Sequence, residues 1–272
     1  MTYAFPTGGM PPSSDDPSHA GAIFTTTYAF IPGSVMRDIV ASELPAWTGT
    51  RAWILARPLS GFAETFAQYA VEVVPGGGSD SPEPDTGAEA GIFVASGEMT
   101  LTVDESRRIV GVGGYAYIPP GHNWTVRNDD TTALQFHWVR KRYLPTAGLA
   151  RPDPILTSDA EVPIDWIDSA ENWGTTRFAD PSDLRHDMHV NIVTFEPGGR
   201  IPFAETHVME HGIYVLEGTA EYLLNRDWFS VEPGDFLWLR AFCPQACIAT
   251  GSGRFRYLLY KDVNRHPELV AR

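Results

Sequence analysis

The segment PFAETHVMEHGIYVLEG, residues 202–218, holds the side chains with the clearest potential for chemistry. Glu205, His207 and His211 lie within seven positions and lead directly into an apolar run typical of a β-strand. Because strand side chains alternate between faces, Glu205 and His207 share one face, and His211 shares it if the strand continues. A carboxylate and two imidazoles that converge in a protein interior need a partner, and a divalent cation provides one. The pattern therefore predicts a metal site.

Each of these residues also has an ordinary structural interpretation. A single histidine such as His207 is more often a hydrogen-bonded core or surface residue than a metal ligand. Glu210 has the opposite parity, so we expect it to face outward and to play no part in the site. The combination of one carboxylate and two imidazoles in a glycine-framed strand pattern is what favours a metal over coincidence.

Two copies of one module carry this segment and its surroundings. Residues 91–124 align without a gap with residues 212–245, 121 positions further along, and their glycine and apolar positions coincide. The same offset pairs residues 134–141 with residues 255–262. A repeat of this kind indicates that one supersecondary unit occurs twice in tandem.

Each copy is predicted to consist of short strands. Runs of Val, Ile, Tyr, Phe and Trp are bounded by Gly, Pro, Asn and Asp at intervals of about 8–12 residues, a spacing typical of all-β sandwiches and barrels. We expect an N-terminal arm and barrel over residues 1–143 and a C-terminal barrel over residues 184–272. Between them, residues 144–183 are Pro-rich, and we expect an irregular connector with room for one short helix.

The second module resembles the two cupin sequence motifs. The usual first motif has His-x-His followed by Glu, and the second has a His; here Glu205 replaces the first His, His211 the Glu and Gln245 the last His. With ETHVMEHG, FCPQAC and YLLYKDVNRH, this variant closely resembles the (S)-ureidoglycine aminohydrolase family. The resemblance covers both modules, but its specific features lie in residues 190–266.

This resemblance implies an all-β bicupin fold, two tandem cupin β-barrels of the double-stranded β-helix jelly-roll type with few short helices. It also implies one Mn²⁺ per chain in the C-terminal barrel, bound by Glu205, His207, His211 and Gln245. Two imidazoles, a carboxylate and an amide without a thiolate suit a hard six-coordinate ion such as manganese or ferrous iron. Four protein ligands leave about two positions for substrate or water.

The resemblance further implies hydrolysis of (S)-2-ureidoglycine to (S)-ureidoglycolate and ammonia, in the allantoin branch of purine catabolism. The implied substrate contacts are Glu205, Gln245, Tyr222, Tyr257 and Lys261, of which Glu205, Tyr257 and Lys261 are the implied catalytic residues. Tyr257 and Lys261 share one strand face in RYLLYK, so both can face a barrel interior. An inward lysine would anchor a carboxylate or donate a proton, whereas a strand-end lysine would reach solvent.

The first module lacks this set. The positions that correspond to the four ligands are occupied by Pro84, Thr86, Ala90 and Trp124. His122 and His137 lie near these positions in the sequence, but neither occupies one. We therefore expect a metal-free N-terminal barrel that serves packing, assembly or the shaping of the site.

Composition restricts the partners of the chain. A formal charge of −14 opposes binding to nucleic acid or an anionic membrane, since both require a basic surface. No apolar run is long enough to span a membrane, and the first residues lack the basic start and apolar core of a secretory signal. Cys243 and Cys247 have neither zinc nor redox spacing, which favours reduced thiols. We expect a cytoplasmic homo-oligomer that acts on a small ureide.

Two other classes of function stay open on sequence grounds. A ferrous cupin oxygenase acting on a small organic acid would use a similar pocket, although more often with a His-rich ligand set. A non-catalytic, ligand-binding bicupin would be expected to lose the ligands in both modules, whereas the second module keeps a complete set.

Overall fold

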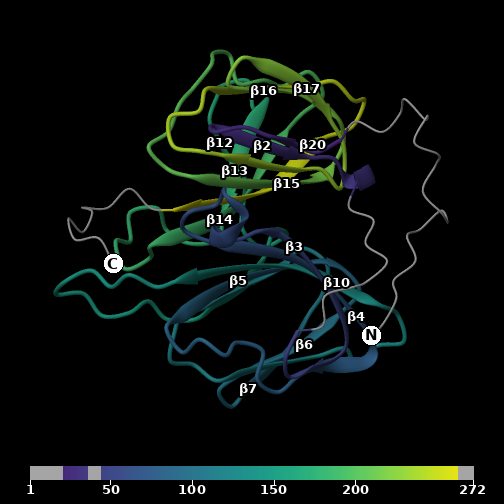
Figure 1. Cartoon of the computed structure of the whole chain (residues 1–272), viewed down its shortest axis with the longest axis vertical. Helices are drawn as coiled ribbons and strands as arrows, with labels where there is room; N and C mark the ends of the chain where they lie inside the picture. The colour runs from purple at the N-terminus through teal and green to yellow at the C-terminus, as the bar shows by residue number, and fades with distance from the viewer. Residues whose placement is uncertain (1–20, 36–43, 263–272) are drawn as a thin grey trace.

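The structure, a computed structural model, describes residues 21–35 and 44–262 and consists mainly of β-strands. Figure 1 shows two barrels stacked along the long axis, with the second module above the first. The helical elements within the described ranges are two 3₁₀ turns, η1 (Gly33–Val35) and η2 (Pro58–Ser60). The expected all-β bicupin with few short helices is therefore confirmed. No helix in these ranges is long and apolar enough to cross a membrane.

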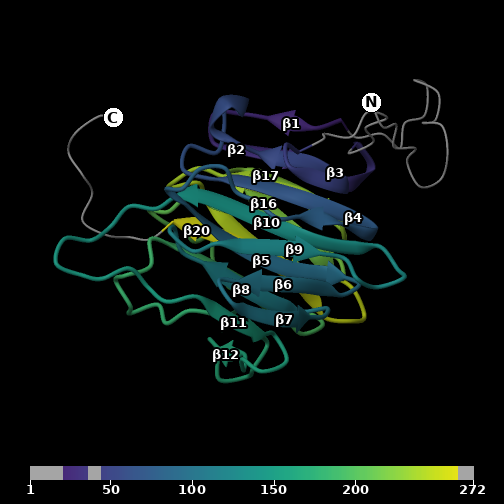
Figure 2. The same cartoon turned by 90° about the horizontal axis from the view of Figure 1, so that it is seen from below.

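The first barrel is formed by a nine-stranded sheet with the order β11-β8-β5-β10-β4-β9-β6-β7, in which β3 also pairs with β4. Figure 2 shows β4, β10, β5 and β8 following one another across this sheet. Its strands are β3 (Trp47–Ala56), β4 (Ala67–Ser79), β5 (Ala88–Ser96), β6 (Met99–Val103), β7 (Ser106–Val110), β8 (Gly114–Ile118), β9 (Trp124–Arg127), β10 (Leu134–Arg142) and β11 (Ile155–Ser158).

The second barrel combines an eight-stranded sheet, β1-β2-β18-β15-β20-β14-β13-β12, with a three-stranded sheet, β17-β16-β19. The strands of the larger sheet are β1 (Ile23–Phe24), β2 (Tyr28–Ile31), β12 (Asp165–Trp166), β13 (Trp173–Arg177), β14 (Met188–Phe195), β15 (His211–Glu217), β18 (Phe236–Leu239) and β20 (Phe255–Asp262). The smaller sheet contains β16 (Ala220–Leu224), β17 (Asp227–Val231) and β19 (Gln245–Ala249).

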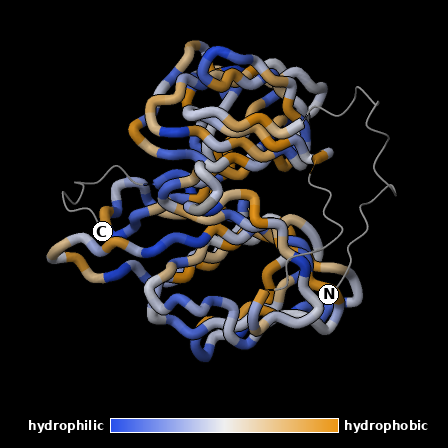
Figure 3. The backbone as a smooth tube through the Cα atoms, in the orientation of Figure 1, coloured by the Kyte–Doolittle hydropathy of each residue, from blue (hydrophilic) through white to orange (hydrophobic). Residues whose placement is uncertain are grey.

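The central strands of both barrels are buried on both faces. In β20, Tyr257 packs into the core of the second barrel, whereas the next residue, Leu258, packs into a separate core between the barrels. In β5, Ile92 and Phe93 divide in the same way between the first barrel and the inter-barrel core. Burial of both faces explains why these strands are long apolar runs instead of alternating patterns, and Figure 3 shows such hydrophobic stretches in both barrels.

Strand pairing crosses the boundaries that the sequence suggested. Strand β2, which we assigned to the N-terminal arm and barrel, pairs with β18 of the second barrel. The expected irregular connector, residues 144–183, contains β11, β12 and β13 and no helix within the part that the structure describes. These strands have only two to five residues each, and they pair along existing sheet edges, which would otherwise expose unpaired backbone groups.

Candidate metal centre

Backbone pairing brings two segments of the second barrel together at the predicted ligands. Glu205 and Gln245 form an isolated antiparallel bridge in which each backbone N–H donates to the other's carbonyl at 2.9 Å. The N–H of Phe242 donates to the carbonyl of His207 at 2.6 Å and fixes the next turn. The condition under which His211 would share the face of Glu205 and His207, a strand that continues to it, is not met, because β15 begins only at His211 and the chain bends before it.

The side chains of Glu205, His207 and Gln245 converge on one point. Glu205 Oε1 lies 3.3 Å from His207 Nε2 and accepts a hydrogen bond of 3.3 Å from Gln245 Nε2. Two ligand atoms that bind next to each other on one divalent ion, each about 2.0–2.6 Å from it, are roughly 3–3.5 Å apart. Glu205 Oε1 and His207 Nε2 therefore already have a spacing that suits a shared cation.

The fourth predicted ligand lies beside this point. The ring of His211 stacks on that of His207, with centroids 5.0 Å apart and planes 23° from parallel. Within residues 21–35 and 44–262, no three His, Cys, Asp or Glu side chains enclose a cation as they stand. His211 is 4% exposed, and burial lowers its pKa to about 4. Its imidazole is thus neutral at pH 7, the form that binds a metal.

Two buried tyrosines line the same interior. The Tyr222 hydroxyl donates to Gln245 Oε1 at 2.8 Å, and the rings of Tyr222 and Tyr257 meet edge to face at 6.0 Å. Burial raises the pKa of both phenols well above the usual range, so they remain protonated and can donate hydrogen bonds. The structure therefore places both predicted tyrosines near the ligand set.

Lys261 lies in β20 between two histidines. His189 of β14 and His211 of β15 are its register partners on the neighbouring strands. Lys261 is partly buried, and that burial, followed by the positive charge of Arg177, lowers the pKa of its ammonium group. Among the described residues, neither a hydrogen bond nor an ion pair engages Nζ. Asp262 partly offsets this lowering, but no described carboxylate lies within ion-pair distance of Nζ. A partly desolvated cation of this kind is suited to an anionic ligand.

Glu210 shows that one expectation from the sequence is wrong. It is 7% exposed instead of outward-facing, and its carboxylate accepts hydrogen bonds from the first module and from Trp238. The expectation of solvent exposure fails because the first barrel packs on the face to which Glu210 points. Sequence reasoning also missed His189 and Arg177, the neighbours of Lys261. The alternation of side chains between the two faces of β13 and β14 could have indicated them.

The corresponding region of the first barrel contains no such set. Ala90 and Trp124 are core residues, while Pro84 and Thr86 lie in the loop before β5. His137 faces the second barrel, with its ring 4.1 Å from that of Tyr214. His122 contacts Asp104 at the surface of the first barrel, with Nδ1 and Oδ2 2.8 Å apart. Neither histidine faces the interior of the first barrel with a second ligand.

Comparison with known proteins agrees with this architecture. The family model for the cupin domain matches residues 69–140 and 191–260, one copy in each barrel. The chain is 32% identical over 234 residues to the (S)-ureidoglycine aminohydrolase of Escherichia coli K12, with 85% of this chain and 87% of that protein covered. It is 31% identical over 260 residues to the Arabidopsis thaliana protein of the same name, with 93% and 81% covered.

Solved structures extend the comparison. A Pseudomonas aeruginosa protein, provisionally described as glyoxylate induced, is 57% identical, with a TM-score of 0.89 over the whole of both chains. Bacillus subtilis oxalate decarboxylase, whose structure was determined in work on its Mn(II) centres, is 13% identical with a TM-score of 0.60 over 80% of this chain and 74% of that one, and so shares the fold alone. Because it contains two cupin copies and is almost one-third identical to enzymes of that name over most of its length, the chain belongs to the (S)-ureidoglycine aminohydrolase family of bicupins.

Proposed function

We propose that this protein binds Mn²⁺ in its second barrel and hydrolyses (S)-2-ureidoglycine to (S)-ureidoglycolate and ammonia. Its close relatives carry the name of this activity. The single observation that carries the proposal in the structure is the position of Lys261. Lys261, whose ammonium group is partly buried, is the register neighbour of His211, beside the converging side chains of Glu205, His207 and Gln245. A substrate that has both a carboxylate and chelating nitrogen atoms matches this pair of features.

The donor set supports a hard cation at this place. One carboxylate, two imidazoles and one amide, without a thiolate, favour manganese or ferrous iron over closed tetrahedral zinc. When bound, such an ion would orient the substrate and stabilise negative charge that develops on it. In the structure, Gln245 directs Nε2 to Glu205 and Oε1 to Tyr222. Rotation of this amide by half a turn would present its oxygen, the atom that binds cations.

The remaining residues divide the tasks of binding and proton transfer. We assign the substrate carboxylate to the Lys261 ammonium group, through a charge-assisted hydrogen bond. The protonated phenols of Tyr222 and Tyr257 donate hydrogen bonds to the ureido or carboxylate oxygens. Glu205 accepts a proton from the attacking water, in addition to its role as a ligand. In the net reaction the bond from Cα to the amino nitrogen breaks, a bond from Cα to the water oxygen forms, and the amino group leaves as ammonia.

A coupled assay tests this proposal. Because ureidoglycine is unstable, a partner amidohydrolase generates it from allantoate in the presence of Mn²⁺ and the purified protein. We expect faster release of ammonia than in the protein-free control, with one enantiomer of ureidoglycolate accumulating. A racemic product, or release at the spontaneous rate, would reject the proposal. Consumption of oxygen with a small organic acid would instead support a cupin oxygenase.

A further inference from the structure

The side chain of Glu210 joins the two barrels immediately next to a proposed ligand. Its Oε1 accepts hydrogen bonds from the backbone N–H of Glu64 and from Trp238 Nε1, both at 2.6 Å. Its Oε2 accepts from the backbone N–H of Thr65 at 3.0 Å and from the Thr65 hydroxyl at 2.6 Å. The first module thus supplies three of four donors to a carboxylate of the second. We call this contact the Glu210 clasp.

The backbone around Glu210 and Gly212 has further contacts, one within the second barrel and one to the first module. The N–H of Glu210 donates to Asp262 Oδ1 at 2.6 Å. The ring of Phe66, which follows Thr65, stacks on Tyr260 with centroids 3.9 Å apart. Phe66 also covers Gly212 so closely that a Cβ atom there would lie 2.6 Å from the ring. His211, between Glu210 and Gly212, is therefore held on both sides by contacts to the segment before β4.

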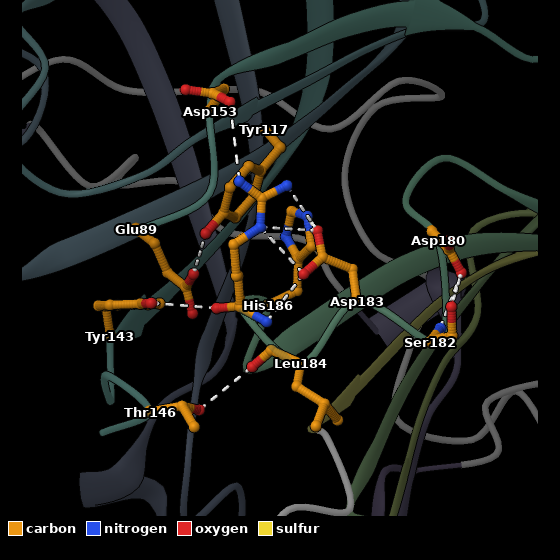
Figure 4. A network of polar contacts seen from close by, with 11 residues as sticks. Glu89, Tyr117, Tyr143, Thr146, Asp153, Asp180, Ser182, Asp183, Leu184 and His186 are labelled. Carbon is orange, nitrogen blue, oxygen red and sulfur yellow. Dashed lines mark hydrogen bonds and ion pairs between the residues drawn. The ribbon is translucent and has the colours of Figure 1, made fainter. Parts of the chain in front are cut away.

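The repeat places a corresponding clasp in the first module. Glu89 lies 121 positions before Glu210, and Tyr117 lies 121 positions before Trp238. The Tyr117 hydroxyl donates to Glu89 Oε2 at 2.6 Å, as Figure 4 shows. Burial, followed by the hydrogen bond and charge of Asp187, raises the pKa of Glu89 well above its usual range. Asp187 belongs to the second module, so this contact also crosses the interface. We call it the Glu89 clasp.

The two clasps differ in the residue that comes next along the chain. The residue after Glu210 is the proposed ligand His211, whereas the residue after Glu89 is Ala90. Each of these two residues lies at or near the start of the corresponding strand, β15 or β5. A loss of the Glu210 clasp would therefore release a ligand, and a loss of the Glu89 clasp would release an alanine.

We propose that Glu210 is a positioning residue for the metal centre, through which the first barrel holds the backbone of His211 in place beside the other proposed ligands. The inference rests on the proposed metal site, but not on the identity of the reaction. Residues that orient metal ligands through hydrogen bonds commonly change metal affinity by about 10–100-fold when they are removed. The first barrel thus takes part in the site without contributing a ligand.

Matched variants of the full-length protein test this role. The pair Glu210→Ala and Glu89→Ala removes a buried carboxyl group from corresponding positions, and each is expected to lower the melting temperature. Thr65→Val is a milder change, because Thr65 is exposed and loses only its hydroxyl, and Thr65→Ser restores that hydroxyl. For each variant the Mn²⁺ dissociation constant is measured by the EPR signal of free Mn²⁺, at a temperature where every variant is folded.

We expect Glu210→Ala to raise the dissociation constant about 10–100-fold, Thr65→Val to raise it several-fold, and Thr65→Ser and Glu89→Ala to leave it unchanged. Equal changes in the two alanine variants, or none in Glu210→Ala and Thr65→Val, would overturn the proposal. If Glu210→Ala does not fold, the comparison of Thr65→Val with Thr65→Ser decides alone. A wild-type protein that binds Mn²⁺ but leaves ureidoglycine unchanged would reject the proposed reaction while the affinities still decide the clasp.

Discussion

Replacement of Lys261 by methionine is the most informative single perturbation of the candidate site. Methionine keeps most of the length of the side chain and removes only the ammonium group. Within the described residues Nζ has neither a hydrogen bond nor an ion pair, so the change leaves none of these residues without a hydrogen-bond or ion-pair partner. If Lys261 anchors the substrate carboxylate, the variant loses binding free energy for the substrate and the transition state, and the stability of the fold is not reduced.

The expected magnitude follows from the type of contact. A hydrogen bond between charged groups contributes about 1.5–3 kcal/mol, which corresponds to a decrease of roughly 10–150-fold in kcat/KM. Burial lowers the pKa of Lys261, which means that the folded protein disfavours its charge. The Lys261→Met variant should therefore be at least as stable as the wild type, with an unchanged Mn²⁺ content.

The assay is the coupled release of ammonia, together with elemental analysis and thermal unfolding of the same preparations. The only other lysine in the chain, Lys141, provides the control. Its ammonium group forms a buried ion pair with Asp187, so Lys141→Met should cost about 3–5 kcal/mol of stability, because a buried carboxylate loses its cation. We thus expect Lys261→Met to lose activity and keep its stability, and Lys141→Met to lose stability.

Unchanged kinetics in Lys261→Met would refute the reasoning and return Lys261 to the role of a strand-end lysine that reaches solvent. A loss of bound Mn²⁺ in that variant would refute it in another way, because the residue would then support the metal centre and not the substrate.

Three further predictions concern the metal and the buried histidines. Wild-type protein should hold about one Mn²⁺ per chain and a Glu205→Ala/His207→Ala variant almost none by elemental analysis; two per chain would contradict a metal-free first barrel. Tyr222→Phe removes the hydrogen bond to Gln245 and should weaken Mn²⁺ binding about two- to tenfold in the same EPR titration. An unchanged affinity would mean that this hydrogen bond does not support Gln245 as a ligand. Burial lowers the pKa of His137 from 6.5 to about 4, so below pH 6.5 the unfolded chain takes up a proton that the folded chain resists. His137 should therefore destabilise the fold by up to roughly 3 kcal/mol as the pH falls from 6.5 to 4. The free energy of unfolding of His137→Phe, measured in urea, should decline less steeply over this window. Equal slopes in the variant and the wild type would mean that His137 does not cause the decline.

The fold and the metal-binding segment were predictable because their signals are local. Short apolar runs with regular turn residues, repeated at a fixed offset, identify two β-barrels without knowledge of any long-range contact. The approach of Glu205 and His207 to Gln245 follows from motif spacing, and the structure brings their side chains together. The strand parity argument was less successful, because the chain bends between Glu205 and His211.

The contacts between the barrels were not predictable from such signals. The alternation rule places Glu210 on the face opposite to that of His211, but the rule does not say what covers that face. The other barrel covers it, and the glutamate is buried among hydrogen-bond donors. The pairing of β2 with β18 joins residues 28–31 to residues 236–239, and neither segment has a pattern that specifies so distant a partner.

That pairing has a consequence for the order in which the protein can fold during synthesis. Ribosomes release the N-terminal part of a chain first, and domains generally fold in that order. Here β2 pairs with β1 on one edge, but its other edge must wait for a partner strand roughly two hundred residues later. The sheet of the second barrel includes β1 and β2, which precede the whole first barrel in the sequence, so a break in the connector would leave these two strands on a different fragment from the rest of that barrel. The two modules repeat one pattern in sequence, but the second can be completed only with strands that are synthesised before the first.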